Sequence, residues 1–196
     1  MIRRAWAIAV ALILTASIAS PAVAWRWNGG WWPNTVGPQV AVCIVGQYLW
    51  DRQALIFGGI YLWGQATTLG VLHLGTCDAS DPWEVQVKET AHVCDGTQAW
   101  WIPIGQAPNG NRSKGYINFN TSCYPNMNFK AVAAHEMGHA HGLDHTNLTG
   151  GTTHEIMDSP EGRDCVTQLS IDDADGIRAR YPGWARNGVG FPANCT

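Results

Sequence analysis

The sequence predicts an α+β fold, because strand-like and helix-like patterns both recur along the chain. Short apolar or alternating runs, separated by segments rich in Gly, Pro and Asn, are typical of strands. They span residues 40–45, 69–74, 84–88, 98–104 and 116–120. Longer stretches with helical spacing begin near residues 51, 129 and 170. No internal repeat, low-complexity tract or linker is present in the sequence, so residues 25–196 are predicted to form one domain.

Residues 1–24 are predicted to be a secretory signal peptide. Arg3 and Arg4 precede an almost wholly apolar run, and Ala22 and Ala24 provide the small residues of a cleavage site. The alternative is an uncleaved membrane anchor, since the apolar run approaches the length of a membrane span. The cleavage site favours removal, so we expect the remaining chain to be secreted, free of the membrane and monomeric.

The charge of the mature chain argues against nucleic acid as a partner. Removal of the signal peptide takes away two of the 12 basic residues and leaves ten against 15 acidic ones. Charged residues make up only 14% of the sequence, and none of the basic ones form a stripe.

Six cysteines follow the predicted cleavage site, and an even number in a secreted chain predicts three disulfides. They are Cys43, Cys77, Cys94, Cys123, Cys165 and Cys195. The pairs Cys77–Cys94 and Cys165–Cys195 are favoured, because each would close a local loop. A metal site of thiolates is the alternative, but the sequence contains no C-x-x-C pair.

The strand predictions rest on patterning and on the loops between the strands. Residues 40–45 form an apolar run typical of a buried strand, whereas residues 84–88 alternate between apolar and polar. Pro103 predicts an edge position for the strand at 98–104, because proline donates no ladder hydrogen bond. Residues 105–115 are rich in Gly, Asn and Pro and are predicted to be a loop.

The helix predictions rest mainly on residues suited to N-caps. These are Asp51 for a helix to Ala66, Asn126 or Asn128 for the second helix, and Ser170 for a helix to about Tyr181. Gly58 and Gly59 weaken the first prediction by roughly 1 kcal/mol each. Asp173, three residues after Ser170, completes a variant of the capping box. The Trp- and Gly-rich segment Trp25–Trp32 is expected to pack along the domain, with carbohydrate or hydrophobic-surface binding as the alternative.

The most specific motif is H-E-x-x-H-x-x-G-x-x-H, formed by His135, Glu136, His139, Gly142 and His145. On a helix, His135 and His139 lie one turn apart on the same face and can reach one ion. Gly142 can adopt a positive φ that ends the helix and returns the chain, so that His145 becomes a third ligand. Three imidazoles and a water are typical of a catalytic zinc site rather than a structural one.

The remaining histidines are not expected to bind this ion. His141 lies about 200° around the helix from His139, so we predict that it packs or caps the helix. His73, His92 and His154 are isolated in sequence and are interpreted as surface or core residues. Four N-x-[ST] sequons occur, at Asn111, Asn120, Asn147 and Asn194.

The chain resembles the metzincins, and within that clan the matrixins, over residues 115–181 and only loosely before them. The motif is followed by Thr146, and Ile156-Met157 with Pro160 resembles the Met-turn. The sequences GYINFN at 115–120 and LSIDDADGIRARY at 169–181 are similar to the strand before the active-site helix and to the C-terminal helix.

The resemblance implies a metzincin-like catalytic domain with a twisted, mostly parallel sheet, an antiparallel edge strand, an active-site helix and a C-terminal helix. It implies that Met157 provides apolar support beneath the metal, and that Met157–Arg163 lines a side-chain pocket. It also implies that the acidic pair of the C-terminal helix is Asp172 and Asp173.

The chain also departs from the matrixin pattern. Asn118 and Asn120 stand where a G-x-x-H-F-D strand would supply ligands to structural zinc and calcium, and a neutral amide is a poorer ligand for both. We therefore expect disulfides to stabilise the domain in place of these ions. No P-R-C-G segment occurs, which argues against latency by a cysteine switch, and Asp158 replaces the tyrosine that often follows the Met-turn methionine.

The expected function is zinc-dependent cleavage of peptide bonds in protein substrates. Zinc held by His135, His139 and His145 would lower the pKa of a bound water to about 7, and Glu136 would accept its proton and pass it to the leaving amine. The peptide is expected to lie extended along residues 99–103. The alternatives are a secreted binding protein with a non-catalytic zinc site and a hydrolase of other amides; a pure binder has no need of Glu136.

Overall fold

The computed structural model describes residues 26–27, 32, 39–66, 70–74, 77, 84–106, 112–145, 156–157 and 168–182. The predicted signal peptide, the Cys165–Cys195 pair, His154 and residues 158–163 of the predicted side-chain pocket lie outside the described residues. No helix in the described part of the chain has the length and apolar character needed to cross a membrane.

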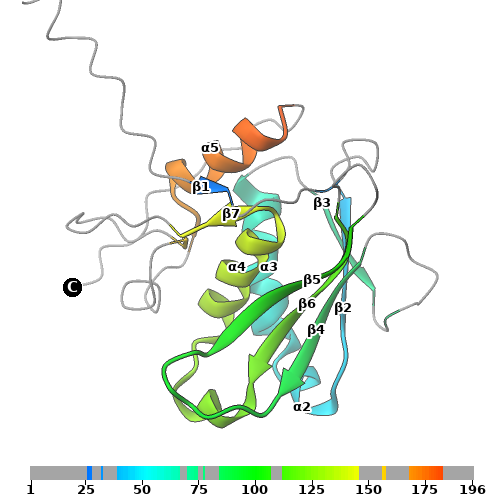
Figure 1. Cartoon of the computed structure of the whole chain (residues 1–196), viewed down its shortest axis with the longest axis vertical. Helices are drawn as coiled ribbons and strands as arrows, with labels where there is room; N and C mark the ends of the chain where they lie inside the picture. The colour runs from blue at the N-terminus through cyan, green and yellow to red at the C-terminus, as the bar shows by residue number, and fades with distance from the viewer. Residues whose placement is uncertain are drawn as a thin grey trace, which may run out of the picture.

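A five-stranded sheet forms one layer of the fold (Figure 1). Its strands are β2 (Gln39–Ile44), β3 (Gly70–Leu74), β4 (Glu84–Thr90), β5 (Ala99–Gln106) and β6 (Arg112–Asn120), in the order β3-β2-β4-β6-β5. All neighbours are parallel except β5, which pairs antiparallel with β6 at the edge. The predicted α+β fold, with a mostly parallel sheet and an antiparallel edge strand, is confirmed.

Alternation along the strands separates the two faces of the sheet. Ile44, Val87 and Ile117 lie side by side across β2, β4 and β6, and all three are buried in the core. Gln86 and Lys88, on the opposite face of β4, are only partly buried. Since side chains alternate with a period of two, the pattern that predicted β4 also determines which face meets the helices.

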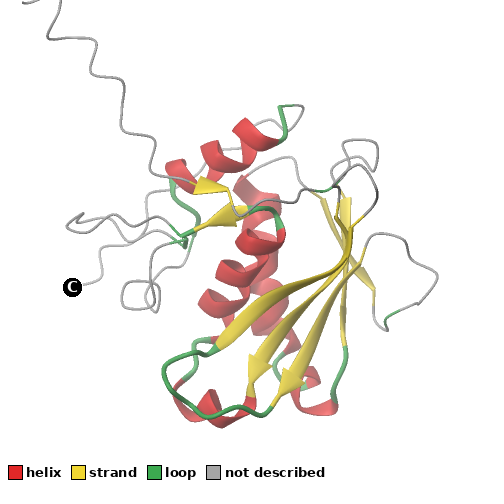
Figure 2. Cartoon of the chain, viewed as in Figure 1, coloured by secondary structure: helices red, strands yellow, loops and turns green. Residues whose placement is uncertain are grey.

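Two long helices, α3 (Gln53–Ala66) and α4 (Phe129–Ala140), cover one face of the sheet and pack against each other (Figure 2). A Cβ added at Gly59 would collide with the carbonyl oxygen of Lys130 and lie 3.0 Å from the backbone nitrogen of Ala134. The glycine that weakens the helix prediction therefore allows the two helix backbones to approach closely.

The first helix begins later than predicted. A one-turn helix, α2 (Gln47–Trp50), precedes α3, and Asp51 is the C-cap of α2 rather than the N-cap of α3. The backbone N–H of Arg52 donates to the carbonyl oxygen of Leu49 at 3.0 Å and closes the turn. Aspartate favours turns as well as N-caps, so composition alone did not distinguish the two positions.

The loop predicted at residues 105–115 is shorter than expected. Strand β5 continues to Gln106 and β6 begins at Arg112, so the start of β6 occupies part of the predicted loop. The register shifts between Pro103 and Gly105 and again before Gln106. Irregular pairing of this kind lets an edge strand continue past proline. Strand β5 lies at the edge of the sheet, so the predicted edge position of Pro103 is confirmed.

The C-terminal helix α5 (Ile171–Arg180) begins with the predicted capping box. The backbone N–H of Asp173 donates to Oγ of Ser170 at 3.0 Å, and the N–H of Ser170 donates to Oδ2 of Asp173 at 3.1 Å. After the helix, the hydroxyl of Tyr181 donates to the carbonyl oxygen of His141 at 3.1 Å and accepts from the N–H of Trp32 at 3.0 Å. This hydroxyl therefore joins three distant parts of the chain.

A second, two-stranded sheet lies beside α5 (Figure 1). It pairs β1 (Arg26–Trp27) antiparallel with β7 (Leu143–Asp144). The buried Trp32 also packs against Trp101, with ring centroids 6.4 Å apart. The described part of the Trp-rich segment thus lies along the rest of the fold.

The predicted pair Cys77–Cys94 is wrong. Cys43 of β2 bonds to Cys77, with Cα atoms 5.0 Å apart, and Cys94 bonds to Cys123, with Cα atoms 5.2 Å apart. Each bond joins residues in or just after neighbouring parallel strands: β2 and β3 in the first case, β4 and β6 in the second. Strand order, rather than the length of the closed loop, determines these partners.

Candidate metal centre

Helix α4 carries the first two histidines, and residues at both of its ends fix its position. Oδ1 of Asn128 accepts from the backbone N–H of Ala131 at 3.2 Å, which identifies Asn128 rather than Asn126 as the N-cap. At the other end Gly142 has φ 98°, the left-handed conformation predicted for the bend, and the chain returns through β7 to His145.

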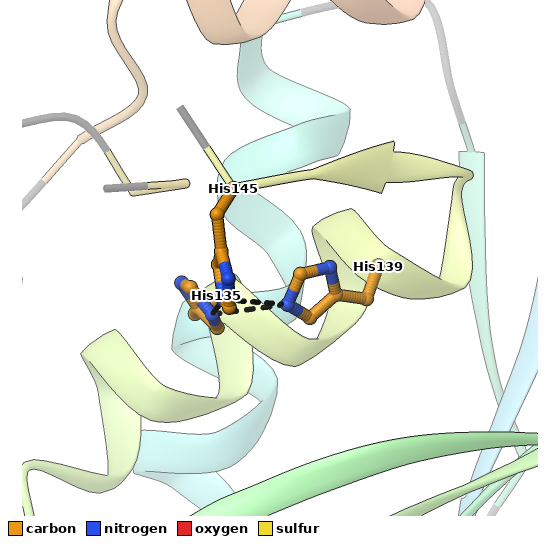
Figure 3. Close-up of side chains that lie close together, drawn as sticks. All are labelled: His135, His139 and His145. Atoms are coloured by element: carbon orange, nitrogen blue, oxygen red, sulfur yellow. Dashed lines mark hydrogen bonds between the residues drawn. The ribbon is translucent and has the colours of Figure 1, made fainter. Parts of the chain in front are cut away.

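The imidazoles of His135, His139 and His145 point toward one another from the helix and from the segment after β7 (Figure 3). Their Nε2 atoms form a triangle with sides of 3.1 Å between His135 and His139, 3.0 Å between His135 and His145, and 3.2 Å between His139 and His145. The fold therefore brings together three residues that the motif separates by up to ten positions.

Backbone carbonyl groups define which nitrogen of two rings carries the proton. Nδ1 of His135 lies 2.6 Å from the carbonyl oxygen of Ile156, and Nδ1 of His139 lies 2.8 Å from that of Leu143. A carbonyl oxygen only accepts hydrogen bonds, so both Nδ1 atoms are donors and both Nε2 atoms carry lone pairs in the neutral rings.

This arrangement fits a divalent metal ion. Lone pairs that face each other at about 3 Å without a proton repel, and a shared cation removes the repulsion. Tetrahedral zinc with Zn–N bonds of about 2.0–2.1 Å would hold its nitrogens roughly 3.3 Å apart, close to the sides of the observed triangle. The Nδ1–H···O=C bonds are also the typical outer contacts of zinc-binding histidines. His135, His139 and His145 therefore have the chemistry and the spacing to hold zinc.

Glu136 lines the same cleft as the three histidines and is itself buried. It follows His135 on α4, so its carboxylate reaches the cleft from the helix that supplies two of the imidazoles. A buried carboxylate beside a metal ion is suited to accept a proton from a water at that ion.

Met157 packs against the backbone of α4 at Gly138. A Cβ at Gly138 would collide with Sδ of Met157 and lie 2.8 Å from Cζ2 of Trp63. The Nε1–H of Trp63 donates to the carbonyl oxygen of Ala134 at 2.9 Å. Gly138, between the two helical histidines, thus leaves the space that Met157 and Trp63 fill.

Asp173 holds residues 156 and 157 in place from α5. Its carboxylate accepts hydrogen bonds from the backbone N–H of Ile156 at 3.1 Å and of Met157 at 3.3 Å, in addition to that of Ser170. Burial raises the pKa of Asp173 to about 6, although these donors oppose the shift. The sequence indicated Asp173 as part of a cap, but carried no signal for its contact with the segment beneath the histidines.

The other described histidines lie apart from the triangle. His141 is the C-cap of α4, is fully buried and places its ring 5.7 Å from that of Trp63. His92 is exposed, with its ring 6.1 Å from that of Trp100. His141 therefore has the packing and capping position that its place on the helix predicts.

The two asparagines that depart from the matrixin pattern are buried and hydrogen-bonded. Oδ1 of Asn120 accepts from the N–H groups of His92 and Ser122, while its Nδ2 donates to the carbonyl oxygen of Thr97 at 3.0 Å. Oδ1 of Asn118 accepts from the hydroxyl of Thr90 at 3.3 Å. An amide can both donate and accept, so Asn120 fixes the loop before β5, and its burial leaves this sequon inaccessible in the folded chain.

The sequence of the chain matches the model of a known protein family. The family model described as matrixin, peptidase family M10, matches residues 52–182, which include all three histidines of the triangle, Glu136 and the C-terminal helix. A comparison with curated proteins found no match.

Proposed function

The chain belongs to the matrixin family, a metallopeptidase-type domain, and we propose that it is a secreted zinc-dependent endopeptidase. The observation that carries this proposal is the triangle of Nε2 atoms, with the carboxylate of Glu136 in the same cleft. Family membership supports protein or peptide substrates. The predicted signal peptide and the two disulfides support an oxidising, extracellular compartment.

In the proposed mechanism His135, His139 and His145 would hold a zinc ion, with their Nε2 lone pairs as the available donors. When bound, zinc acts as a Lewis acid that acidifies a water and polarises the substrate carbonyl group. As the oxygen of a water adds to the carbonyl carbon, the carboxylate of Glu136 would accept the proton of this water, and it would deliver the proton to the amine nitrogen as the C–N bond breaks. The carbonyl groups of Ile156 and Leu143 keep the rings oriented while the charge of the site changes.

We further propose that the substrate lies extended along β5. This strand is at the edge of the sheet, and its first residues line the cleft together with the histidines. An edge strand offers free main-chain groups to an added strand, and such binding depends little on the substrate sequence. Residues Met157–Arg163 remain the proposed lining of a side-chain pocket, as the resemblance implies.

The test is cleavage of a random peptide library by the purified chain without residues 1–24, with and without o-phenanthroline, followed by sequencing of the products. The proposal expects cleavage of internal peptide bonds that the chelator abolishes and added zinc restores. Stoichiometric zinc binding without any cleavage would overturn it and favour a binding protein with a non-catalytic zinc site.

A further inference from the structure

The cleft beside the histidines contains acidic groups that the proposed chemistry does not use. It has a volume of about 620 Å³, and its lining includes Asp95, Trp100 and Asp144 in addition to Glu136 and the histidines. Among the described residues that line it, none is lysine or arginine. Apart from the proposed zinc ion, the described side chains that line the cleft therefore include carboxylates but no lysine or arginine.

Asp95 is the acidic residue available to a substrate. Glu136 is assigned to proton transfer, and Oδ1 of Asp144 accepts a hydrogen bond from the backbone N–H of His145 at 2.8 Å. Asp95 is exposed, whereas Asp144 is only partly exposed, and Oδ1 of Asp95 accepts from the N–H of Thr97 at 3.0 Å. Hydrogen bonds from Thr97 lower the pKa of Asp95, so its carboxylate is ionised at neutral pH.

The loop that carries Asp95 is fixed to the body of the sheet from two sides. The disulfide of Cys94 with Cys123 joins it to the 3₁₀ helix η2 (Thr121–Asn126). The amide of Asn120 donates to the carbonyl oxygen of Thr97 at 3.0 Å. A carboxylate on a loop held in this way binds a partner with little further loss of conformational entropy.

Trp100 lines the same cleft as Asp95 and is partly buried, so its indole adds an apolar surface to that cleft. Lysine and arginine combine a cationic head with an alkyl stem that packs on aromatic rings. The carboxylate and the indole together match these side chains in both charge and shape. An acidic side chain beside Asp95 would meet a like charge.

We propose that Asp95 is a specificity-determining residue, which selects substrates with a lysine or arginine side chain close to the scissile bond. This inference rests on the proposed peptidase function. The stem of the basic residue packs against Trp100 while its head pairs with Asp95. Because the pair is exposed to solvent, salt weakens the preference.

The first experiment compares cleavage by the zinc-loaded mature chain of peptides that differ only at one position near the cut, with Arg, Lys, Gln, Leu or Glu. Each of three positions on either side of the cut is varied in turn. At one position, Arg and Lys are expected to raise kcat/KM about five- to tenfold over Gln. Failure to cleave any peptide would overturn the peptidase function, and the inference with it. Cleavage without preference for a basic residue would overturn the inference alone.

The second experiment uses Asp95→Asn, which keeps the oxygen that accepts from Thr97 but removes the charge. It should lower the ratio of kcat/KM for the Arg peptide to that for the Gln peptide about two- to fivefold, because the apolar contact with Trp100 remains. Asp95→Lys should reverse the order of the Arg and Glu peptides. Asp175→Asn, on α5 and outside the cleft, is the charge-matched control and should behave as the parent. Equal losses on the Arg and Gln peptides in Asp95→Asn would contradict the specificity role.

Discussion

The imidazole of His135 donates from Nδ1 to the backbone carbonyl oxygen of Ile156 at 2.6 Å, across 21 residues of sequence. The N–H of the same Ile156 donates to the carboxylate of Asp173 at the start of α5. One peptide segment thus connects the C-terminal helix to a histidine of the candidate metal centre. Since Nδ1 and Nε2 belong to one rigid ring, whatever moves Ile156 also moves the lone pair that would face the metal.

Asp173→Ala is expected to weaken zinc binding although Asp173 contacts none of the three histidines directly. The change leaves the N–H groups of Ile156, Met157 and Ser170 without their acceptor, which should lower the free energy of unfolding by about 2–4 kcal/mol. Loss of this outer support should weaken zinc affinity about 10- to 100-fold. Urea unfolding and competition with a chromophoric chelator measure the two effects. Unchanged zinc affinity would show that the ring of His135 is held without Asp173.

Ionisation of the buried Asp173 should lower the free energy of unfolding as pH rises. Burial raises its pKa to about 6 from 3.8, so between these pH values the folded chain keeps a proton that the unfolded chain releases. This group's contribution to the free energy of unfolding is largest below pH 3.8 and decreases by up to about 3 kcal/mol as pH passes 6. Urea unfolding at pH 4.5 and 7 with chelator present, compared with the non-titrating Asp173→Asn, isolates the effect. A parent-minus-variant difference that rises with pH would contradict this sign.

Glu136→Gln should retain one zinc per chain and lose peptidase turnover by several orders of magnitude, about 10²–10⁴-fold from the missing proton transfer. The amide is nearly isosteric with the carboxylate but accepts no proton at neutral pH. Zinc content from atomic emission and cleavage of a quenched fluorescent peptide provide the two measurements. Undiminished turnover would assign the base to another group, whereas loss of zinc would give Glu136 a role in holding the metal.

Replacing each of the two adjacent glycines of α3 by alanine should change the free energy of unfolding in opposite directions. Gly58→Ala meets no atom within 4 Å and should raise the free energy of unfolding by about 0.5–1 kcal/mol through helix propensity. Gly59→Ala pushes a methyl group into the backbone of α4 at Lys130 and should lower it by about 1–3 kcal/mol. Thermal unfolding of both variants provides the measurement. Stabilisation by Gly59→Ala would mean that α3 and α4 separate without cost.

The sequence correctly predicted those helices and strands that have strong local patterns. Val85 and Val87 alternate with polar residues, and they form the core face of β4. Ser170 and Asp173 are three residues apart, and they cap α5 as that spacing predicts. Helix caps and alternation depend on neighbours in sequence, which a single chain displays directly. Asp51 shows the limit, because aspartate suits the end of one turn as well as the start of a helix.

Contacts between residues that are distant in sequence could not be predicted from local patterns. Cys94 pairs with Cys123 rather than with Cys77 because β4 and β6 are neighbours in the sheet, and strand order is not encoded by spacing. Asp95 and Trp100 carried no motif, and only the packing of β5 beside α4 places them in one cleft with the histidines. The carbonyl groups of Ile156 and Leu143 have no side-chain signal at all, since every residue has one.

The sequence by itself determined the identity of the metal-binding chemistry, because four-residue spacing on a helix and a glycine bend are local properties of the backbone. The tertiary structure alone decided how the imidazoles are oriented, which cysteines pair and which acidic side chains line the cleft. These features depend on contacts between segments that meet only when the sheet and helices pack, and packing is a property of the whole chain.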